Sequence, residues 1–250
     1  MRRMPIAKSK VKIQKSKRII YSRILAIALS LLVPCVLCLS PCFAAPSYGT
    51  KMPKQRQFFM GLQNHNVFDR DLEGDDGEME SMQDFFLLSF GLADWFSVDL
   101  KGGTGNVHQD LVSGGERVYP TFVGGGYGFR LRVWEKDNFK AVCGFQHISI
   151  HPQSIDIGPV KHKAVLDDWQ FSATASYACK RVTPYLGMKC SRMDYIHWTD
   201  GERNRVKSDT DKSVGIIGGL DIALTQRLWI NLEGQYFDAE AAAFSLNYSF

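Results

Sequence analysis

The last nine residues, 242–250, read Ala-Ala-Phe-Ser-Leu-Asn-Tyr-Ser-Phe. Apolar and polar side chains alternate here, so that Phe244, Leu246, Tyr248 and Phe250 fall on one face of an extended chain. Successive side chains of a β-strand point to opposite faces, and this period of two indicates a strand with one apolar and one polar face. The same alternation recurs upstream, and it decides the fold class.

Ten segments with this alternation predict ten strands. The connections between them alternate between long, charged stretches and short turns, except that the last one, 238–241, is short where a long one is expected. Such alternation is typical of a transmembrane barrel with long extracellular loops and short periplasmic turns. We therefore predict an all-β fold, an antiparallel up-and-down transmembrane barrel of about ten strands, with eight strands as the alternative. The segments are 57–68, 82–92, 95–104, 119–133, 139–151, 167–179, 183–198, 213–223, 228–237 and 242–250, and the long connections are 69–81, 105–118, 152–166 and 199–212.

A soluble β-sandwich is the competing fold, because its strands also alternate. Its connections need not alternate in length, however. In lipid, backbone polar groups must be bonded between strands, so a spanning sheet has to close. Aromatic residues near both ends of the predicted strands also favour the barrel, in which they form girdles at the two interfaces. Examples are Trp95, Trp134 and Trp229 near short turns, and Tyr119 and Trp169 near long connections.

The basic charge of the chain is confined to its beginning. Nine of the 30 Lys and Arg residues, and none of the 26 Asp and Glu residues, lie in residues 1–44, so the remainder carries a net charge of −5. An apolar run, 24–39, is followed by Cys42 and Ala44, small residues at −3 and −1 of a signal-peptidase site. We predict a signal peptide over 1–44, a short periplasmic segment over 45–56 and the barrel over 57–250. A retained anchor and a lipoprotein signal ending at Cys42 are the alternatives.

Together the leader, the alternating strands, the connections and the terminal Phe250 resemble bacterial outer-membrane β-barrel proteins. The resemblance covers essentially the whole predicted mature chain and implies a place in the bacterial outer membrane. It also implies that Phe244, Leu246, Tyr248 and Phe250 form an assembly signal for the barrel assembly machinery. The expected partners are outer-membrane lipids, including lipopolysaccharide. We expect a monomer with no metal, no cofactor and no nucleic-acid partner, since the acidic remainder removes the support for nucleic-acid binding.

Charged residues of both signs fall on the polar, inward face of the predicted strands. Inside a narrow barrel an isolated charge is costly, so we expect Asp99 and Glu233 each to contact an inward Lys or Arg. A hairpin centred near residue 112 would place Asp99 opposite about residue 125. A ten-stranded lumen filled by such side chains leaves little room for solute. The inward set is Asp99, Lys101, Arg130, Arg132, Lys189, Asp221 and Glu233.

His147 and Ser149 are two residues apart, so on a strand their side chains point to the same face. The alternation in this segment predicts that this face meets lipid. A histidine beside a serine can activate the hydroxyl as a nucleophile if a carboxylate orients the ring. The pair resembles the His-x-Ser of outer-membrane lipid A 3-O-deacylases, which implies His147 as base and Ser149 as nucleophile. No glutamate follows nearby, and the carboxylates that would replace it are Asp156, Asp167 and Asp168. The alternative is a polar strand end at headgroup level.

Omptin-type proteases offer a third comparison, because such barrels carry acidic residues and a histidine near the outer rim. Asp194 and His197 stand at that level, but they are three apart and so point to opposite faces.

From the sequence as a whole we expect an outer-membrane barrel with a structural, narrow-pore or surface-interaction role. The alternative is a lipid A-modifying hydrolase that uses Ser149 and His147.

Overall fold

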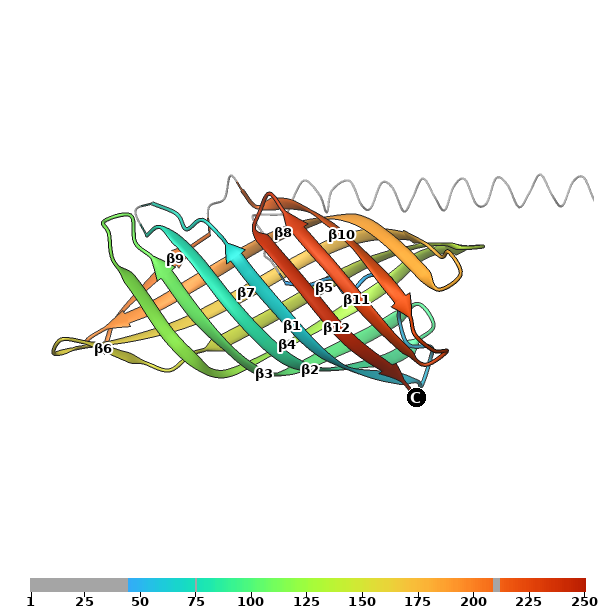
Figure 1. The fold of residues 1–250 in the computed structure, drawn as a ribbon, viewed down its shortest axis with the longest axis horizontal. Coiled ribbons are helices and arrows are strands. Elements are labelled where there is room, and N and C mark those ends of the chain that lie inside the picture. The colour runs from blue at the N-terminus through green and yellow to red at the C-terminus, as the bar shows by residue number, and fades with distance from the viewer. Residues whose placement is uncertain (1–44, 75, 209–211) are drawn as a thin grey trace, which may run out of the picture. The chain divides into compact units, whose positions relative to one another are not determined.

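The computed structural model describes residues 45–74, 76–208 and 212–250, so the predicted signal peptide lies outside the described residues. The described chain is built from β-strands (Figure 1). Their bounds are β1 Phe58–Asp69, β2 Glu78–Ala93, β3 Phe96–Asp110, β4 Glu116–Lys136, β5 Phe139–His151, β6 Ile155–Ile157, β7 Val160–Tyr177, β8 Val182–Thr199, β9 Glu202–Lys207, β10 Val214–Ala223, β11 Leu228–Tyr236 and β12 Glu240–Ser249.

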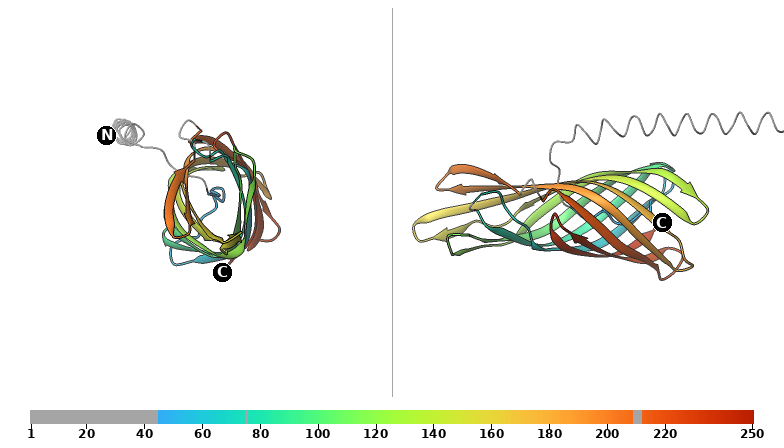
Figure 2. Two further views of the ribbon diagram at one scale, coloured as in Figure 1. Left: turned by 90° about the vertical axis from the view of Figure 1, so that its left-hand side faces the viewer. Right: turned by 90° about the horizontal axis from the view of Figure 1, so that it is seen from above.

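Ten of these strands close into a ring by antiparallel pairing. Each pairs with its neighbour along the chain, and β1 completes the ring by pairing with β12, where Leu62 lies opposite Leu246. The view down the barrel shows the strands surrounding a common interior (Figure 2). The two remaining strands, β6 and β9, pair with β7 and β8 and lengthen hairpins at one end. The predicted all-β, ten-stranded antiparallel barrel is thus confirmed, and eight strands are excluded.

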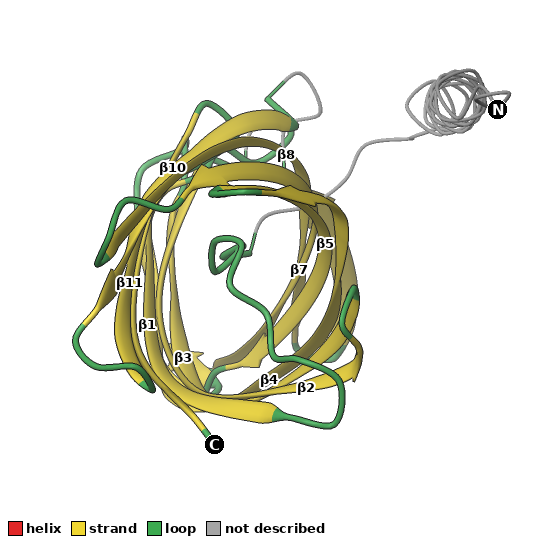
Figure 3. Ribbon diagram, turned by 90° about the vertical axis from the view of Figure 1, so that its right-hand side faces the viewer, coloured by secondary structure: helices red, strands yellow, loops and turns green. Residues whose placement is uncertain are grey.

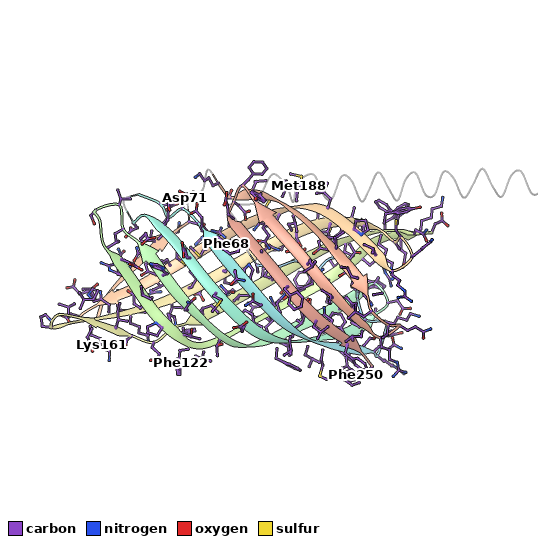
Figure 4. All side chains as sticks on the ribbon, in the orientation of Figure 1. Phe68, Asp71, Phe122, Lys161, Met188 and Phe250 are labelled. Carbon is purple, nitrogen blue, oxygen red and sulfur yellow. The ribbon has the colours of Figure 1, made fainter. Side chains whose placement is uncertain are left out.

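The outer wall of the barrel is apolar. Leu62, Leu100 and Leu186 are each about 60% exposed on outward-facing positions, and many further apolar side chains share this face. Figure 4 shows Phe68, Met188 and Phe250 on the outside of the wall. Soluble proteins do not expose so large a continuous apolar surface, whereas a closed barrel with such an exterior is the architecture of outer-membrane proteins. The barrel therefore lies in the bacterial outer membrane.

Within the described ranges, no helix is long and apolar enough to span a membrane.

Several strands run further than the sequence predicts. β2 begins at Glu78 rather than near residue 82, β3 continues to Asp110 rather than 104, and β7 begins at Val160 rather than 167. These extensions all lie at the end with the long connections. Beyond the bilayer both faces of a strand can be polar, so the alternation that marks a strand in the sequence is lost while the hydrogen-bond ladder continues.

Segment 45–53 lies inside the barrel, which corrects the prediction of a periplasmic segment. Figure 3 shows this stretch as a loop within the ring of strands. Residues 45–50 are all buried, and their backbone and side chains bond to inward side chains of distant strands. The Ser47 Oγ, for instance, donates to Glu233 Oε2 at 2.7 Å. Polar groups on the inner wall give this short segment partners that water would otherwise supply.

The interior divides into two regions. Toward the long connections, inward apolar side chains form a packed cluster that includes Met79, Tyr119, Ile150 and Tyr195, each fully buried. Toward the short turns, the inward side chains are mostly polar or charged and pack around most of segment 45–53, with one small apolar cluster in which Tyr48 packs with Phe59, Leu87 and Trp229. A water-filled channel would expose inward side chains to solvent. Here most of them are buried instead, so the interior is a protein core.

Phe250 lies where the assembly-signal prediction needs it, on the outer wall at the seam of the barrel. Its ring stacks on Phe58 of β1 with centroids 4.5 Å apart and meets Tyr248 edge-on at 5.0 Å. The stripe Phe244, Leu246, Tyr248 and Phe250 faces outward along β12. Its role in assembly stays a prediction.

Candidate active site

A cluster of polar side chains lies across β5 and β7 on the outward face of the barrel, and its members are His147, Ser149, His151 and Asp167. Ser149 stands directly opposite Asp167, and His147 stands opposite Trp169. His151 follows two residues after Ser149 and so shares its face. Cross-strand neighbours have Cβ atoms about 4.5–5.5 Å apart, close enough for their side chains to bond. The pairing register of one hairpin therefore gathers a serine, two histidines and a carboxylate.

The Ser149 hydroxyl is the centre of this cluster. Its Oγ lies 2.5 Å from Asp167 Oδ1 and 3.0 Å from His151 Nε2. A hydroxyl has one proton to donate, and both neighbours can accept it. His147 Nε2 is 3.9 Å from the same Asp167 oxygen. The arrangement can therefore remove the hydroxyl proton, which is the first requirement of a serine nucleophile.

Aromatic rings hold His147 in place. Its ring centroid lies 4.0 Å from that of Trp169 and 5.1 Å from that of Tyr127. His147 thus forms one wall of the cluster beside Asp167, while His151 is the more exposed of the two histidines.

The height of Ser149 in the membrane follows from its place in β5. It lies ten residues beyond Phe139, the first residue of that strand after a short turn. At about 3.4 Å per residue and a tilt of about 40°, this is roughly 25 Å above the periplasmic end. The apolar band of such barrels is about 25 Å tall. Ser149 therefore sits at the outer boundary between acyl chains and headgroups, where lipid esters lie.

A groove of about 410 Å³ runs beside the serine on the outer wall, lined by Leu100, Tyr127 and His147 among others. Its floor is Gly125, which stands directly opposite Ser149 in the pairing of β4 with β5. The nearest atom to a Cβ built on Gly125 is the Lys101 backbone oxygen at 3.4 Å. The absent side chain leaves room for a linear apolar chain next to the hydroxyl.

The structure separates the three candidate carboxylates. Asp167 is in the cluster, as described. Asp168 faces the interior, where its Oδ1 is 3.8 Å from Arg70 Nη1. Asp156 lies in β6, in the outer hairpin, opposite Lys161. Sequence reasoning missed His151, although its signal was present: it has the same parity as His147 and Ser149.

The residues suggested by the omptin comparison do not form a site together. Asp194 accepts a hydrogen bond from Arg192 Nε at 2.9 Å and another from Arg205. His197 lies on the opposite face of β8 beside Tyr195, with ring centroids 5.4 Å apart. The alternation of the strand keeps them apart, as predicted.

Most of the predicted interior charges lie inside the barrel. Arg130 and Asp99 form a bidentate pair, with Nε–Oδ2 at 3.0 Å and Nη2–Oδ1 at 3.1 Å. Lys189 Nζ lies 2.8 Å from Asp238 Oδ2. Buried members of the predicted set are Asp99, Lys101, Arg130, Lys189, Asp221 and Glu233.

Two predictions about these charges are wrong. Arg132 has the inward parity, but it lies at the short-turn rim, where its guanidinium contacts Glu135 and the Asp94 carbonyl. Glu233 has no Lys or Arg within ion-pair distance among the described residues. Neutral donors replace the expected cation: Ser47, Tyr48 and Tyr185 all donate to its carboxylate. Segment 45–53, which the sequence did not place in the lumen, explains the difference.

The described part of the chain contains no group of three or more His, Cys, Asp or Glu side chains placed to hold an ion.

Comparisons with known proteins give fold likenesses at low identity. No family model and no curated protein matches the chain. The transport unit of the autotransporter AIDA-I from Escherichia coli is similar over 78% of this chain and 91% of its own, at 13% identity and a TM-score of 0.42. An outer membrane channel from Pseudomonas putida F1 is similar over 83% and 100%, at 8% identity and a TM-score of 0.42. The outer membrane protease OmpT from Escherichia coli is similar over 78% and 95%, at 12% identity and a TM-score of 0.36.

Proposed function

We propose that this barrel is an acyl-ester hydrolase of outer-leaflet lipids, with Ser149 as nucleophile and His151 as general base. The observation that carries the proposal is the Ser149 hydroxyl, which lies within hydrogen-bonding distance of both His151 and Asp167 on the lipid-facing wall. His151 takes the role that the deacylase resemblance gives to His147. Lipid A, named by that resemblance, is the first substrate to test.

The proposed reaction runs in two steps. The Ser149 oxygen attacks the ester carbonyl carbon and gives its proton to His151. The ester carbon–oxygen bond then breaks, the lipid alcohol leaves with that proton, and the acyl chain stays on Ser149. In the second step His151 takes a proton from a water molecule as the water oxygen attacks the acyl carbon. The bond between that carbon and the Ser149 oxygen then breaks, and His151 gives the proton to the serine oxygen. The products are a fatty acid and a lipid with a free hydroxyl group.

The surroundings of the site suit an anionic lipid. Along one row of the sheet Ser149 pairs with Asp167, Asp167 with Asp194, and Asp194 with Lys207. Strands are about 4.8 Å apart, so Asp194 is about 10 Å from Ser149 along the wall. Two arginines bond to Asp194 from neighbouring positions. Arg and Lys groups at headgroup level attract lipid phosphates. The strand pairing places five basic residues on the outward rows near Asp194, and together they form a basic cluster: Lys163, Arg192, Arg203, Arg205 and Lys207.

The filled interior disfavours transport through the lumen, and this supports an activity on the outer wall. Transport through the lumen would require segment 45–53 and the packed cluster around Tyr195 to move aside. The external groove needs no such movement, because it already opens toward the acyl chains.

Fatty-acid release from purified protein tests the proposal. We expect refolded protein in vesicles that contain lipid A to release fatty acid, and Ser149→Ala to lower the rate at least 10³-fold, as loss of a serine nucleophile does. Gly125→Leu should lower the rate too, because its side chain fills the groove. Thr104→Ala, which removes a hydroxyl from the outward face of β3, is the matched control and should hydrolyse at the wild-type rate.

Equal release by wild type and Ser149→Ala, or no release from any ester lipid by folded protein, would overturn the hydrolase. The barrel would then have the structural or surface-interaction role that the sequence also allows.

A further inference from the structure

We propose that the lumen contains a binding site for a free chain terminus, and that cleavage between Ala44 and Ala45 creates the group it binds. Hydrolysis of that peptide bond consumes one water, leaving a carboxylate on Ala44 and an α-ammonium group on Ala45. A signal peptidase is the class of enzyme that makes this cut. Segment 45–53 then serves as a plug. This inference does not depend on the hydrolase.

The plug is held at its first residue. Ala45 N lies 2.7 Å from Gln170 Oε1 on β7, and the Ala45 carbonyl accepts from Gln235 Nε2 at 3.2 Å. Both glutamines are buried on the inner wall, and Ala45 itself is fully buried. An ammonium group has three protons to donate, where a peptide nitrogen has one. The site thus receives the chain at the residue where the sequence predicts that the mature protein begins.

Glu233 is the main acceptor for the plug. Its carboxylate accepts from Ser47 N at 2.9 Å, Ser47 Oγ at 2.7 Å and Tyr48 N at 3.1 Å. A buried carboxylate without donors is costly, and charge-assisted hydrogen bonds are about twice as strong as neutral ones. An additional positive charge at Ala45, two residues from Ser47, would favour this carboxylate further.

Tyr48 joins the plug to the inward cations. The Lys101 Nζ lies 4.4 Å from the centroid of the Tyr48 ring, and the Tyr48 hydroxyl donates to Gln146 at 3.0 Å. Lys101 Nζ is buried and has no hydrogen-bond partner among the described residues. The ring therefore provides the cation–π contact that a desolvated ammonium group needs. Further down, Arg130 Nη1 donates to the Lys51 carbonyl at 2.8 Å.

The site favours a terminus over a continuing chain. Side chains around Ala45 are packed, including Leu166, Met193 and Tyr195, all nearly inaccessible to water. A peptide bond or an acetyl group at Ala45 N would remove the α-ammonium charge, which the Gln170 amide oxygen and the nearby Glu233 carboxylate favour.

Hydrogen-exchange mass spectrometry on the refolded barrel tests this inference. We compare protein that begins at Ala45 with two otherwise identical forms, one acetylated at Ala45 and one extended by Gly-Ser-Gly-Ser. The amides of Ser47 and Tyr48 should be protected in the first form. They should exchange about ten- to hundredfold faster in the other two, as expected for loss of one charge-assisted interaction. Glu233→Gln, which keeps the side-chain shape, should speed the same amides in protein that begins at Ala45.

The mature protein from membranes should also begin at Ala45, as its intact mass will show. Equal protection of Ser47 and Tyr48 in all three forms would overturn the terminus site, because the plug would then seat regardless of its first residue. A mature mass that starts elsewhere would overturn the assigned cleavage.

Discussion

Replacing His151 by alanine is expected to slow ester hydrolysis by about 10²- to 10⁴-fold, the usual contribution of a general base. The reason is geometric, because His151 Nε2 lies 3.0 Å from the Ser149 hydroxyl. Rates of fatty-acid release by detergent-refolded variants check this prediction, with the heat-dependent shift of the folded barrel on an electrophoretic gel as the folding control.

His147→Ala is the matched variant for this test. His147 approaches Asp167 at 3.9 Å and packs between two aromatic rings. We expect it to cost less activity than His151→Ala. A larger loss in His147→Ala would restore the role that the deacylase resemblance implies, and it would show that the serine turns toward the other histidine when substrate binds.

Asp99→Ala is expected to lower the free energy of unfolding by about 3–5 kcal/mol, the cost of leaving one member of a buried ion pair alone. Asp99 and Arg130 have almost no exposed side-chain surface, and two hydrogen bonds join them. The Arg130 guanidinium also donates to Ser89 Oγ and to the plug. Its charge would stay buried after the substitution. The urea midpoint of the refolded barrel is the measurement.

Asp156→Ala provides the control for this second prediction, because Asp156 is exposed in the outer hairpin. Its midpoint should match that of the wild type. If Asp99→Ala and Asp156→Ala unfold at the same urea concentration, the buried pair does not contribute as its geometry indicates.

The strands inside the bilayer were predictable because lipid imposes a period of two on them. The face of β12 that carries Phe244 and Leu246 meets lipid, so each second residue has to be apolar. At the start of β2 this constraint ends. There Glu78 and Glu80 are outward and Met79 is inward, so the only apolar residue of the three marks the interior. Strands were predicted from apolar residues on the face that meets lipid. Residues 78–80 have their apolar residue on the inward face, so this pattern does not identify them as part of the strand.

The pairing of residues between neighbouring strands was less predictable than the positions of the strands in the sequence. The pairing places Asp99 opposite Gly128, three residues from the expected position, with an irregularity between Gly105 and Val107. A bulge adds a residue to one strand and shifts all pairs beyond it. Alternation shows which face a side chain takes, but the turn and the bulge decide its neighbour. The Asp99–Arg130 contact follows from this detail.

Contacts between distant parts of the chain explain what the sequence concealed. Segment 45–53 has no alternation, and Ser47 finds its partner 186 residues away, on Glu233. The cluster around Ser149 on the outer wall was predictable in part. Parity alone placed His147, Ser149 and His151 on one face, whereas the choice of Asp167 over Asp168 needed the pairing of β5 with β7.

We propose above that the lipid-facing Ser149 is the nucleophile with which this barrel hydrolyses an ester of an outer-leaflet lipid. Mass spectrometry of lipids extracted from cells that produce the wild-type protein or Ser149→Ala, at equal levels of folded barrel, tests it most directly. We predict that the wild-type sample contains outer-leaflet lipid lighter by one ester-linked acyl chain, and that this species is absent with Ser149→Ala. Identical lipid profiles in the two samples would contradict the claim.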